Sequence, residues 1–409
     1  MRKSLLNSIR KKGSLSLKLS MISLLLFFLI SCKDNPSSSN TTTQTQVQFL
    51  YTSDPHYGIT RPSFQGSSTV TGHAVNAAMI AKMNTISDLT LPADGGVNAG
   101  NKVGGIDFIA QTGDIGNRME TSAGVQSAAT SWSEFAFDYT YGLTLKDNND
   151  QKSKLFLSAG NHDVSNAIGY YKTMSPLTDA TPMAEMYNMM LNPTTPKTAA
   201  TYNYATDKIH YSKDIAGVHF VFISIWPDSS ERVWLNANLS TVSSTTPVIL
   251  FAHDEPPIES KHFTNPNGTH DINSTNKFEN IVPEVFKDGT ATSDPSTIEQ
   301  RAFTTFLKAH TNIKVYFNGN AHENLMYDWA GPDNDITLHV FQVDSPMKGV
   351  VSGTSASDKI GDETKVSFQL VTIDIPSKKV TVRECLWNPT PANPSTPITW
   401  GMSRTVSIQ

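Results

Sequence analysis

From Val47 onward, short apolar and β-branched runs alternate with segments whose apolar residues recur every three or four positions. Such runs are typical of buried strands, and the longer period is typical of helices. The runs predict strands at 48–52, 106–110, 155–157, 218–225, 248–251 and 313–317. Helices are predicted over 75–86, 121–141 and 299–310, and four more strand-like runs follow residue 336. This order predicts an α/β core with packed sheets, one of which the C-terminal strands complete.

The first 31 residues differ from the rest of the chain in charge and hydropathy. They hold six basic residues and no acidic residue, and an apolar run occupies residues 21–30. This run is shorter than the ~20 residues that span a bilayer as a helix, so it predicts a signal peptide. The segment from Leu29 to Cys32 resembles a bacterial lipobox, in which the cysteine is acylated and becomes the mature N-terminus. An ordinary signal peptide or a short membrane anchor is the alternative interpretation.

The lipobox predicts a lipoprotein that is anchored in the bacterial cell envelope, at the periplasmic face or the cell surface. The protein would contact the membrane through the lipid on Cys32. Residues 35–46 are almost all Ser, Thr, Asn and Gln, which cannot bury enough apolar area to fold. We therefore expect a signal peptide over 1–31, a lipidated flexible tether over 32–46 and one folded domain over 47–409.

Composition excludes some functions and one kind of covalent stabilisation. Without residues 1–31, 26 basic residues stand against 37 acidic ones, a formal charge of −11. A domain this acidic has no broad basic face, so no duplex nucleic acid is expected as a partner. The chain has two cysteines, and lipidation of Cys32 would leave Cys385 without a disulfide partner. Cys385 lies in an alternating run and is predicted to be a buried strand residue.

Polar clusters follow the predicted strands at the points where the strands end. They occupy residues 53–56, 113–118, 160–163, 252–257 and 319–322. Four of the 11 histidines lie in them, at positions 56, 162, 253 and 322. Because α/β folds assemble their sites at the carboxyl ends of strands, we expect these clusters to form one site.

In this order the clusters resemble the calcineurin-like metallophosphoesterase superfamily. Its pattern is D-x-H, then G-D-x-x-[DN], then G-N-H-[DE], then a lone His, then G-H-x-H. The resemblance covers about Val47 to Asn324. It implies an α/β fold, specifically a four-layer α/β/β/α metallophosphoesterase sandwich in a single large domain, with the C-terminal strands as part of it.

The resemblance also implies a site that hydrolyses a phosphate ester with two divalent metal ions, which could be Mn, Fe, Zn, Mg or Ca. Two such ions bind phosphate oxygens, lower the pKa of a shared water and aim the hydroxide in line with the leaving group. His162 would face the substrate as a general acid. The implied metal ligands are Asp54, His56 and His322 for the first ion, Asp114 bridging both, and Asn161 and His253 for the second.

One position departs from the pattern, because Asn320 stands where the superfamily has the first histidine of its last motif. An amide oxygen suits harder ions better than imidazole does, and the second ion would then depend on either the Asn320 carbonyl or water. The alternative is a degenerate, non-hydrolytic lipoprotein that uses the scaffold to bind a ligand or a surface partner. Arg118 could clamp the substrate phosphate with its guanidinium group, or be an ordinary surface residue.

Overall fold

The computed structural model describes residues 44–116, 126–165, 179–204, 206–258, 293–347 and 362–409. A compact unit begins at Thr43 and ends at Gln409. The predicted signal peptide, the predicted lipidation site Cys32 and the substrate-clamp candidate Arg118 lie outside the described residues. Within the described ranges, no helix is both long and apolar enough to cross a membrane.

Six strands form the first sheet, in the order β14-β13-β12-β1-β4-β5. The strands β1, β4 and β5 are parallel, whereas β12, β13 and β14 pair in antiparallel fashion and extend the sheet beyond β1. The C-terminal strands thus complete this sheet, as the sequence predicts. The bounds are β1 (Gln46–Thr52), β4 (Phe108–Gln111), β5 (Lys154–Leu157), β12 (Ser367–Asp374), β13 (Lys379–Leu386) and β14 (Thr399–Ser407).

The second sheet also has six strands, in the order β10-β11-β9-β8-β7-β6. Its four middle strands are parallel, and an antiparallel strand closes each edge. The bounds are β6 (Tyr211–Ile215), β7 (Val218–Phe222), β8 (Val248–Phe251), β9 (Ile313–Asn318), β10 (Leu325–Trp329) and β11 (Leu338–Gln342).

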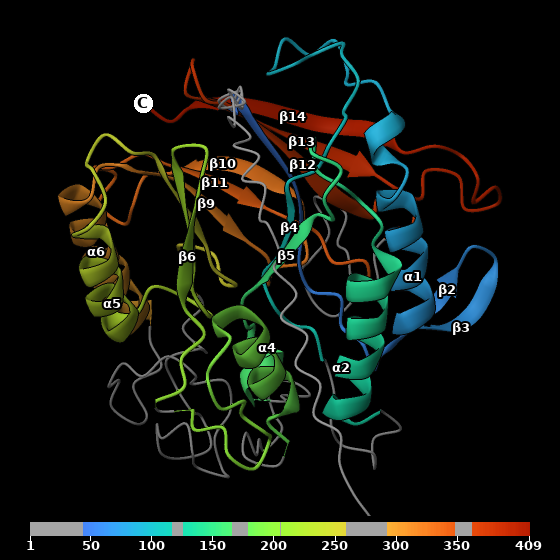
Figure 1. The fold of residues 1–409 in the computed structure, drawn as a ribbon, viewed down its shortest axis with the longest axis horizontal. Helices are drawn as coiled ribbons and strands as arrows, with labels where there is room; N and C mark the ends of the chain where they lie inside the picture. Colours follow the sequence, from blue (N-terminus) through green and yellow to red (C-terminus); the bar gives the residue numbers. More distant parts are fainter. Residues whose placement is uncertain (1–43, 117–125, 166–178, 205, 259–292, 348–361) are drawn as a thin grey trace, which may run out of the picture. The chain divides into compact units, whose positions relative to one another are not determined.

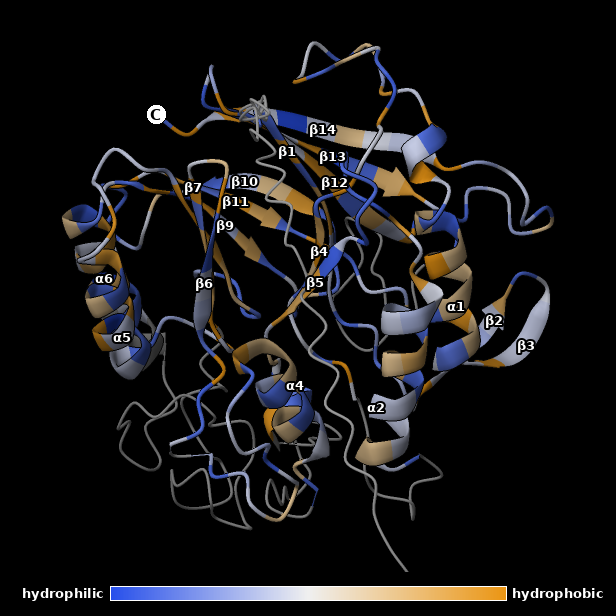
Figure 2. Cartoon of the chain, in the orientation of Figure 1, coloured by the Kyte–Doolittle hydropathy of each residue, from blue (hydrophilic) through white to orange (hydrophobic). Residues whose placement is uncertain are grey.

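Aromatic side chains fill the space between the two sheets. Phe49 of the first sheet lies edge-on to Phe220, Phe251 and Phe317 of the second, with ring centroids 6.0, 5.8 and 5.7 Å apart. Such edge-to-face pairs add to the burial of their apolar area. Figure 2 shows the inner strands as mostly hydrophobic, whereas α5 and α6 carry both classes of residue. The core therefore lies between the sheets, and the helices present a polar outer face.

Helices flank the pair of sheets on both sides (Figure 1). On α6, Phe303 packs against Tyr316 of β9, with ring centroids 6.2 Å apart. On the other side, Val75 and Met79 of α1 are fully buried. This arrangement confirms the predicted four-layer α/β/β/α sandwich. The bounds are α1 (Gly72–Met83), η1 (Ile86–Asp88), α2 (Ala128–Ala136), η3 (Phe137–Gly142), α3 (Asn161–Ser165), α4 (Thr181–Leu191), α5 (Ser229–Leu239) and α6 (Ser293–Ala309).

Some elements differ from the prediction. The strand predicted over 218–225 ends at Phe222, and Ile225 adopts a positive φ of 56° in the following loop. The helix predicted over 121–141 is described from Ala128, and its last turn is the π-helix η3. A hairpin of β2 (Thr60–Phe64) and β3 (Ser67–Thr71), which the sequence pattern did not predict, follows the first polar cluster. Cys385 is fully buried in β13, as predicted.

Candidate metal centre

The five polar clusters each follow a parallel strand, and backbone hydrogen bonds draw them together. The N–H of Asp54, after β1, donates to the carbonyl of Gly113, after β4, over 3.0 Å. In the second sheet the N–H of Gly319, after β9, donates to the carbonyl of His253, after β8, over 2.9 Å. Loops of the two sheets are joined because the N–H of Ile225, after β7, donates to the carbonyl of Ala159, after β5, over 3.1 Å. The carboxyl ends of both sheets therefore meet at one place.

Two motif glycines are required by this close approach. A Cβ at Gly160 would lie 2.2 Å from Asp114 Oδ1, and a Cβ at Gly319 would lie 2.2 Å from Asp54 Oδ2. Both distances are far shorter than a carbon–oxygen contact allows. The glycines of the third and fifth clusters thus make room for carboxylate oxygens of neighbouring loops.

Several predicted ligands have an unusual backbone conformation. Each has a φ between 43° and 61°, in the left-handed region that few non-glycine residues adopt. Asp, Asn and His tolerate this region better than most residues, and strained positions of this kind cluster at functional sites. The residues are Asp54, His56, Asp114, Asn320 and His322.

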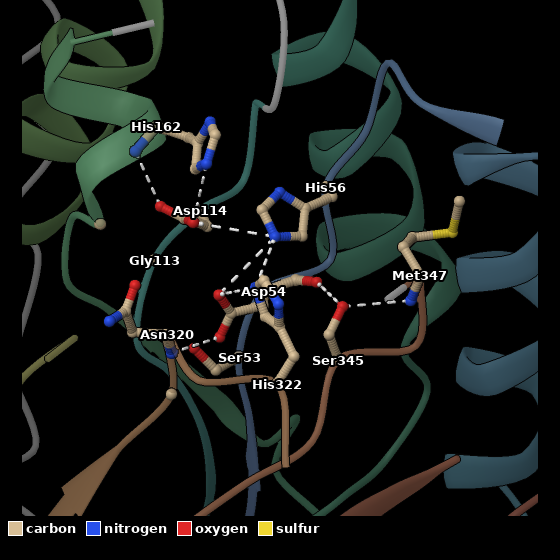
Figure 3. Close-up of polar contacts among 12 residues, drawn as sticks. Ser53, Asp54, His56, Gly113, Asp114, His162, Asn320, His322, Ser345 and Met347 are labelled. Carbon is tan, nitrogen blue, oxygen red and sulfur yellow. Dashed lines mark hydrogen bonds and ion pairs between the residues drawn. The ribbon is translucent and has the colours of Figure 1, made fainter. Parts of the chain in front are cut away.

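The first half of the centre brings together Asp54, His56, Asp114 and His322, each offering one ligand atom (Figure 3). These atoms all lie within 4.8 Å of one another. The Nε2 atoms of His56 and His322 are 3.0 Å apart, and His322 Nε2 is 3.1 Å from Asp54 Oδ1. Two imidazole nitrogens and carboxylate oxygens that converge in this way fit a divalent cation bound by N and O ligands.

The second half lies on the other side of the same carboxylate. Asp114 Oδ2 is 3.7 Å from His56 Nε2, whereas Asp114 Oδ1 is 3.3 Å from His253 Nε2. His253 Nδ1 lies 2.7 Å from the carbonyl of Thr112, which can only accept a hydrogen bond. In neutral His253 the proton is therefore on Nδ1, and Nε2 presents a lone pair toward Asp114.

Asn161 completes this second group. One amide atom lies 2.8 Å from His253 Nε2 and 3.2 and 3.3 Å from the two Asp114 oxygens. If that atom is the amide nitrogen, it donates to the Asp114 carboxylate. A 180° rotation of the amide puts the oxygen at the same place, where it can bind a cation. Asn161 is therefore suited to the metal-free state as a donor and to a cation as a ligand.

The buried charges of the centre influence each other strongly. Burial alone would lower the pKa of His253, but the carboxylates of Asp114 and Asp54 outweigh burial and raise that pKa to about 10. Burial would likewise raise the pKa of Asp114, but nearby imidazoles hold it well below its ordinary value. Without metal, a proton on His253 supplies the positive charge that this cluster of acceptors requires.

Asn320, the departure from the superfamily pattern, is oriented by its amide nitrogen. Its Nδ2 donates to Asp254 Oδ1 over 2.8 Å and to Glu255 Oε2 over 3.3 Å. Its backbone N–H donates to Asp54 Oδ2 over 3.0 Å. Because two carboxylates accept from Nδ2, the orientation of the amide is fixed, and the oxygen is the atom left to act as a ligand.

Ser345 and Asp163 support the site through hydrogen bonds to its loops. Ser345 donates through Oγ to the carbonyl of Asp54 over 2.7 Å (Figure 3). Asp163, in the third polar cluster, accepts hydrogen bonds from the backbone N–H groups of Ile115, Gly116 and Gly160 over 3.0 to 3.1 Å. These bonds tie the second and third clusters together, as outer partners of metal ligands commonly do. No motif marks Ser345, since it follows β11 far along the chain.

His162 lies at the accessible side of the centre. Its backbone N–H donates to Asp114 Oδ1 over 2.8 Å, and its side-chain Nε2 is 3.8 Å from Asp114 Oδ2. The side chains of His162 and His322 are 10% and 17% exposed, whereas Asp54, His56 and His253 are fully buried. His322 and His162 are therefore the two most exposed of the four histidines at the centre.

All eight residues predicted as ligands or as the general acid lie in this one region of the described structure. They are Asp54, His56, Asp114, Asn161, His162, His253, Asn320 and His322. The chain thus has an α/β sandwich and clustered Asp and His motifs that resemble those of the calcineurin-like metallophosphoesterase superfamily, and a group of these residues could hold a metal ion.

No family model and no curated protein matches the chain. Among solved structures, it is similar to a conserved uncharacterized protein of Streptococcus pneumoniae described as a predicted phosphoesterase, at 7% identity and a TM-score of 0.30 over 89% of this chain and 99% of that one. It is also similar to Vps29 of Chaetomium thermophilum, at 8% identity and a TM-score of 0.31 over 89% and 100% of the two chains. A single-mutant Vps29 of Entamoeba histolytica matches at 7% identity and a TM-score of 0.30, over 88% and 100%. The resemblance to the superfamily is carried by the chain's own motifs and by their convergence.

Proposed function

We propose that this protein hydrolyses a phosphate ester and that it binds two divalent cations to do so. The observation that carries the proposal is the position of Asp114 between the two groups of ligands. One of its oxygens faces His56 at 3.7 Å and the other faces His253 at 3.3 Å. A carboxylate that presents one oxygen to each of two groups of metal ligands is suited to bridge two cations ~3.5–4 Å apart.

The chain's own residues then have distinct tasks. Asp54, His56 and His322 would hold the first cation, and Asn161, His253 and the Asn320 oxygen would hold the second. When bound, such cations polarise phosphate oxygens and lower the pKa of a water molecule. His162, at the accessible side, would hold a proton for the leaving oxygen, and its backbone N–H keeps Asp114 in place.

The proposal is tested with the full chain, freed of metal and then supplied with Mn²⁺, Zn²⁺, Mg²⁺ or Ca²⁺. p-Nitrophenyl phosphate and bis(p-nitrophenyl) phosphate serve as monoester and diester probes. Hydrolysis of either ester that requires an added ion and stops with a chelator supports the proposal. Full metal binding without turnover of a broad panel of esters would instead favour a non-hydrolytic binding protein. Asn320 is the observation behind this alternative, because an amide stands there in place of a histidine ligand.

We also propose that the protein is lipid-anchored in the bacterial envelope through Cys32, on the basis of its basic region, apolar run and lipobox. Cys32→Ser should move the protein out of the detergent phase in a phase-separation assay, or block its processing. Cys385→Ser is the matched control, because that thiol is buried in β13 and should not affect partitioning. Unchanged partitioning and migration of Cys32→Ser would contradict the lipid anchor.

A further inference from the structure

A concave site with no assigned role lies at the β5 edge of the first sheet. Its volume is about 390 Å³, and none of the residues that line it is a candidate metal ligand. Small-molecule pockets commonly have volumes of ~300–1,000 Å³. Its walls come from β4 and β5, from η3 and the segment that follows it, from the end of α4, and from β6.

The walls of this pocket are predominantly apolar. Met189 is 39% exposed, which is unusual for a large hydrophobic side chain in this protein. A hollow with such walls stabilises a ligand mainly by removing apolar surface from water. The apolar residues that line it are Ile109, Leu143, Leu145, Leu155, Phe156, Met189 and Met190.

Three lysines border the same hollow. Lys152, Lys154 and Lys213 are exposed, and none forms an ion pair with a carboxylate of the described residues. Lys152 donates to the carbonyl of Thr140, and Lys213 Nζ lies 5.7 Å from the centre of the Tyr211 ring. Because the domain as a whole is acidic, three ammonium groups around one apolar pocket, with no carboxylate among its described lining residues, make a local site for an anion.

An extended peptide is a poor occupant, although β5 is an edge strand. The Tyr211 hydroxyl lies 2.9 Å from the N–H of Leu157 and 2.8 Å from its carbonyl, so that part of the edge is already used. At the other end, Lys146 and Lys152 form a β-bridge across the preceding loop. Addition of a strand needs a run of free backbone groups, which this edge does not offer. The pocket is instead suited to a narrow apolar chain.

We propose that this pocket binds a fatty acid, with the alkyl chain against the apolar walls and the carboxylate near the three lysines. The apolar lining and the charge of the rim match the two parts of such a molecule. The proposal does not depend on phosphoesterase activity, because the pocket and the metal centre share no residue.

The test uses the full chain in a neutral detergent and a tetradecanoic acid that carries a photoactivatable diazirine in its chain. After irradiation, mass spectrometry locates the label. The expected labelled segments are 139–156 and 189–190, and unlabelled tetradecanoate should compete, whereas tetradecylamine should not. Equal competition by the amine would overturn the proposal, because the basic rim would then play no part; so would a label found only elsewhere.

Two variants sharpen this test. The triple substitution Lys152→Gln, Lys154→Gln and Lys213→Gln should lower labelling at a probe concentration below saturation roughly tenfold, since each exposed charge contact contributes a few-fold. Lys365→Gln, an exposed lysine outside the pocket, is the control and should change nothing. Leu155→Trp should fill the hollow and abolish labelling, while an unchanged far-UV spectrum confirms that the variant is folded. Full labelling of Leu155→Trp, or of the triple variant, would contradict the proposal.

Discussion

The two halves of the proposed metal centre share the Asp114 carboxylate but differ in the rest of their ligands. The first half adds the carboxylate of Asp54 and the imidazoles of His56 and His322. The Nε2 atoms of the two imidazoles are 3.0 Å apart. The second half adds the His253 imidazole and the Asn161 amide, and Asn320 is the second neutral amide that we propose for it. The first half therefore carries more negative charge and the ligands that borderline metals prefer.

This difference suggests that the two cations should not be equivalent. A neutral amide oxygen is a weaker ligand than imidazole for ions such as Zn²⁺, and it is relatively better for Mn²⁺, Mg²⁺ or Ca²⁺. We expect the first site to fill at a lower metal concentration and the second to exchange more readily. Hydrolysis would then follow occupancy of the second site.

The largest effect is expected from Asp114→Asn, because this carboxylate belongs to both halves. The metal content should fall from near two ions per chain to one or none, and turnover should be lost with it. Elemental analysis of the purified variant measures the first result and a p-nitrophenyl ester assay the second. Retention of both ions would show that Asp114 does not bridge them.

His162→Ala should separate metal binding from proton transfer. His162 is near both halves but is a predicted ligand of neither, so the metal content should stay near that of the parent. Turnover should fall by a factor of ~10²–10⁴, the usual contribution of a general acid. The loss should be smaller for an ester whose leaving group needs no proton, such as p-nitrophenol. Equal losses for good and poor leaving groups would argue against the general-acid role.

Asn320→His tests the difference between the halves directly. One ring nitrogen of the new imidazole can donate to Asp254, as the Asn320 amide does over 2.8 Å, and the other can serve as a ligand. The second ion should bind more tightly, by a factor on the order of ten, and Zn²⁺ should gain more than Mg²⁺. A metal titration of parent and variant gives the comparison, with Asn320→Ala as the control that lacks any ligand. A weaker second site in Asn320→His would mean that Asn320 is not at the metal.

The smallest effect on either half is expected from a substitution far from both. Arg383 is fully buried in β13 and donates to the Asp94 carboxylate over 2.8 and 3.0 Å. Asp94→Asn should lower the free energy of unfolding by about 1–2 kcal/mol at pH 7, because it removes the charged partner of the Arg383 guanidinium at a pair whose Asp94 end is open to solvent. Metal content and turnover per folded chain should not change.

This pair also has a defined pH dependence. The hydrogen bonds from Arg383 lower the pKa of Asp94 from 3.8 to about 2. Since the folded pKa lies below the unfolded one, the stabilisation is complete above pH 3.8 and is lost as the pH falls through about 2. Denaturant unfolding of parent and Asp94→Asn should therefore converge toward pH 2. A constant difference down to that pH would rule out the ion pair as its cause.

The sequence predicts the layers of the fold because alternating apolar runs such as 48–52 and 313–317 determine which strands are buried. The strand predicted to reach Ile225 ends at Phe222 because the chain turns there to bring Ile225 to Ala159 and His253, a long-range constraint that no local pattern contains. The β2–β3 hairpin carries no apolar pattern that predicts it, because its strands are largely exposed and polar.

The sequence predicts the residues of the site through short local motifs, but not the contacts that hold those residues in place. The spacing of Asp54 and His56, and the clusters after later strands, point to the residues that converge. Local sequence cannot show that Ser345 supports Asp54 from a loop after β11, or that Asn320 is oriented by Asp254. These contacts join segments far apart in the chain, and they exist only once both sheets have packed.

The central claim is that Asp114 joins two unequal cation sites. Calorimetric titration of the metal-free full chain with Mn²⁺ tests it most directly. Two ions per chain, bound in a tighter and a weaker step, with ester hydrolysis appearing as the weaker step saturates, is the result that we predict. A chain that binds no Mn²⁺, or that hydrolyses esters fully with only one ion bound, would contradict it.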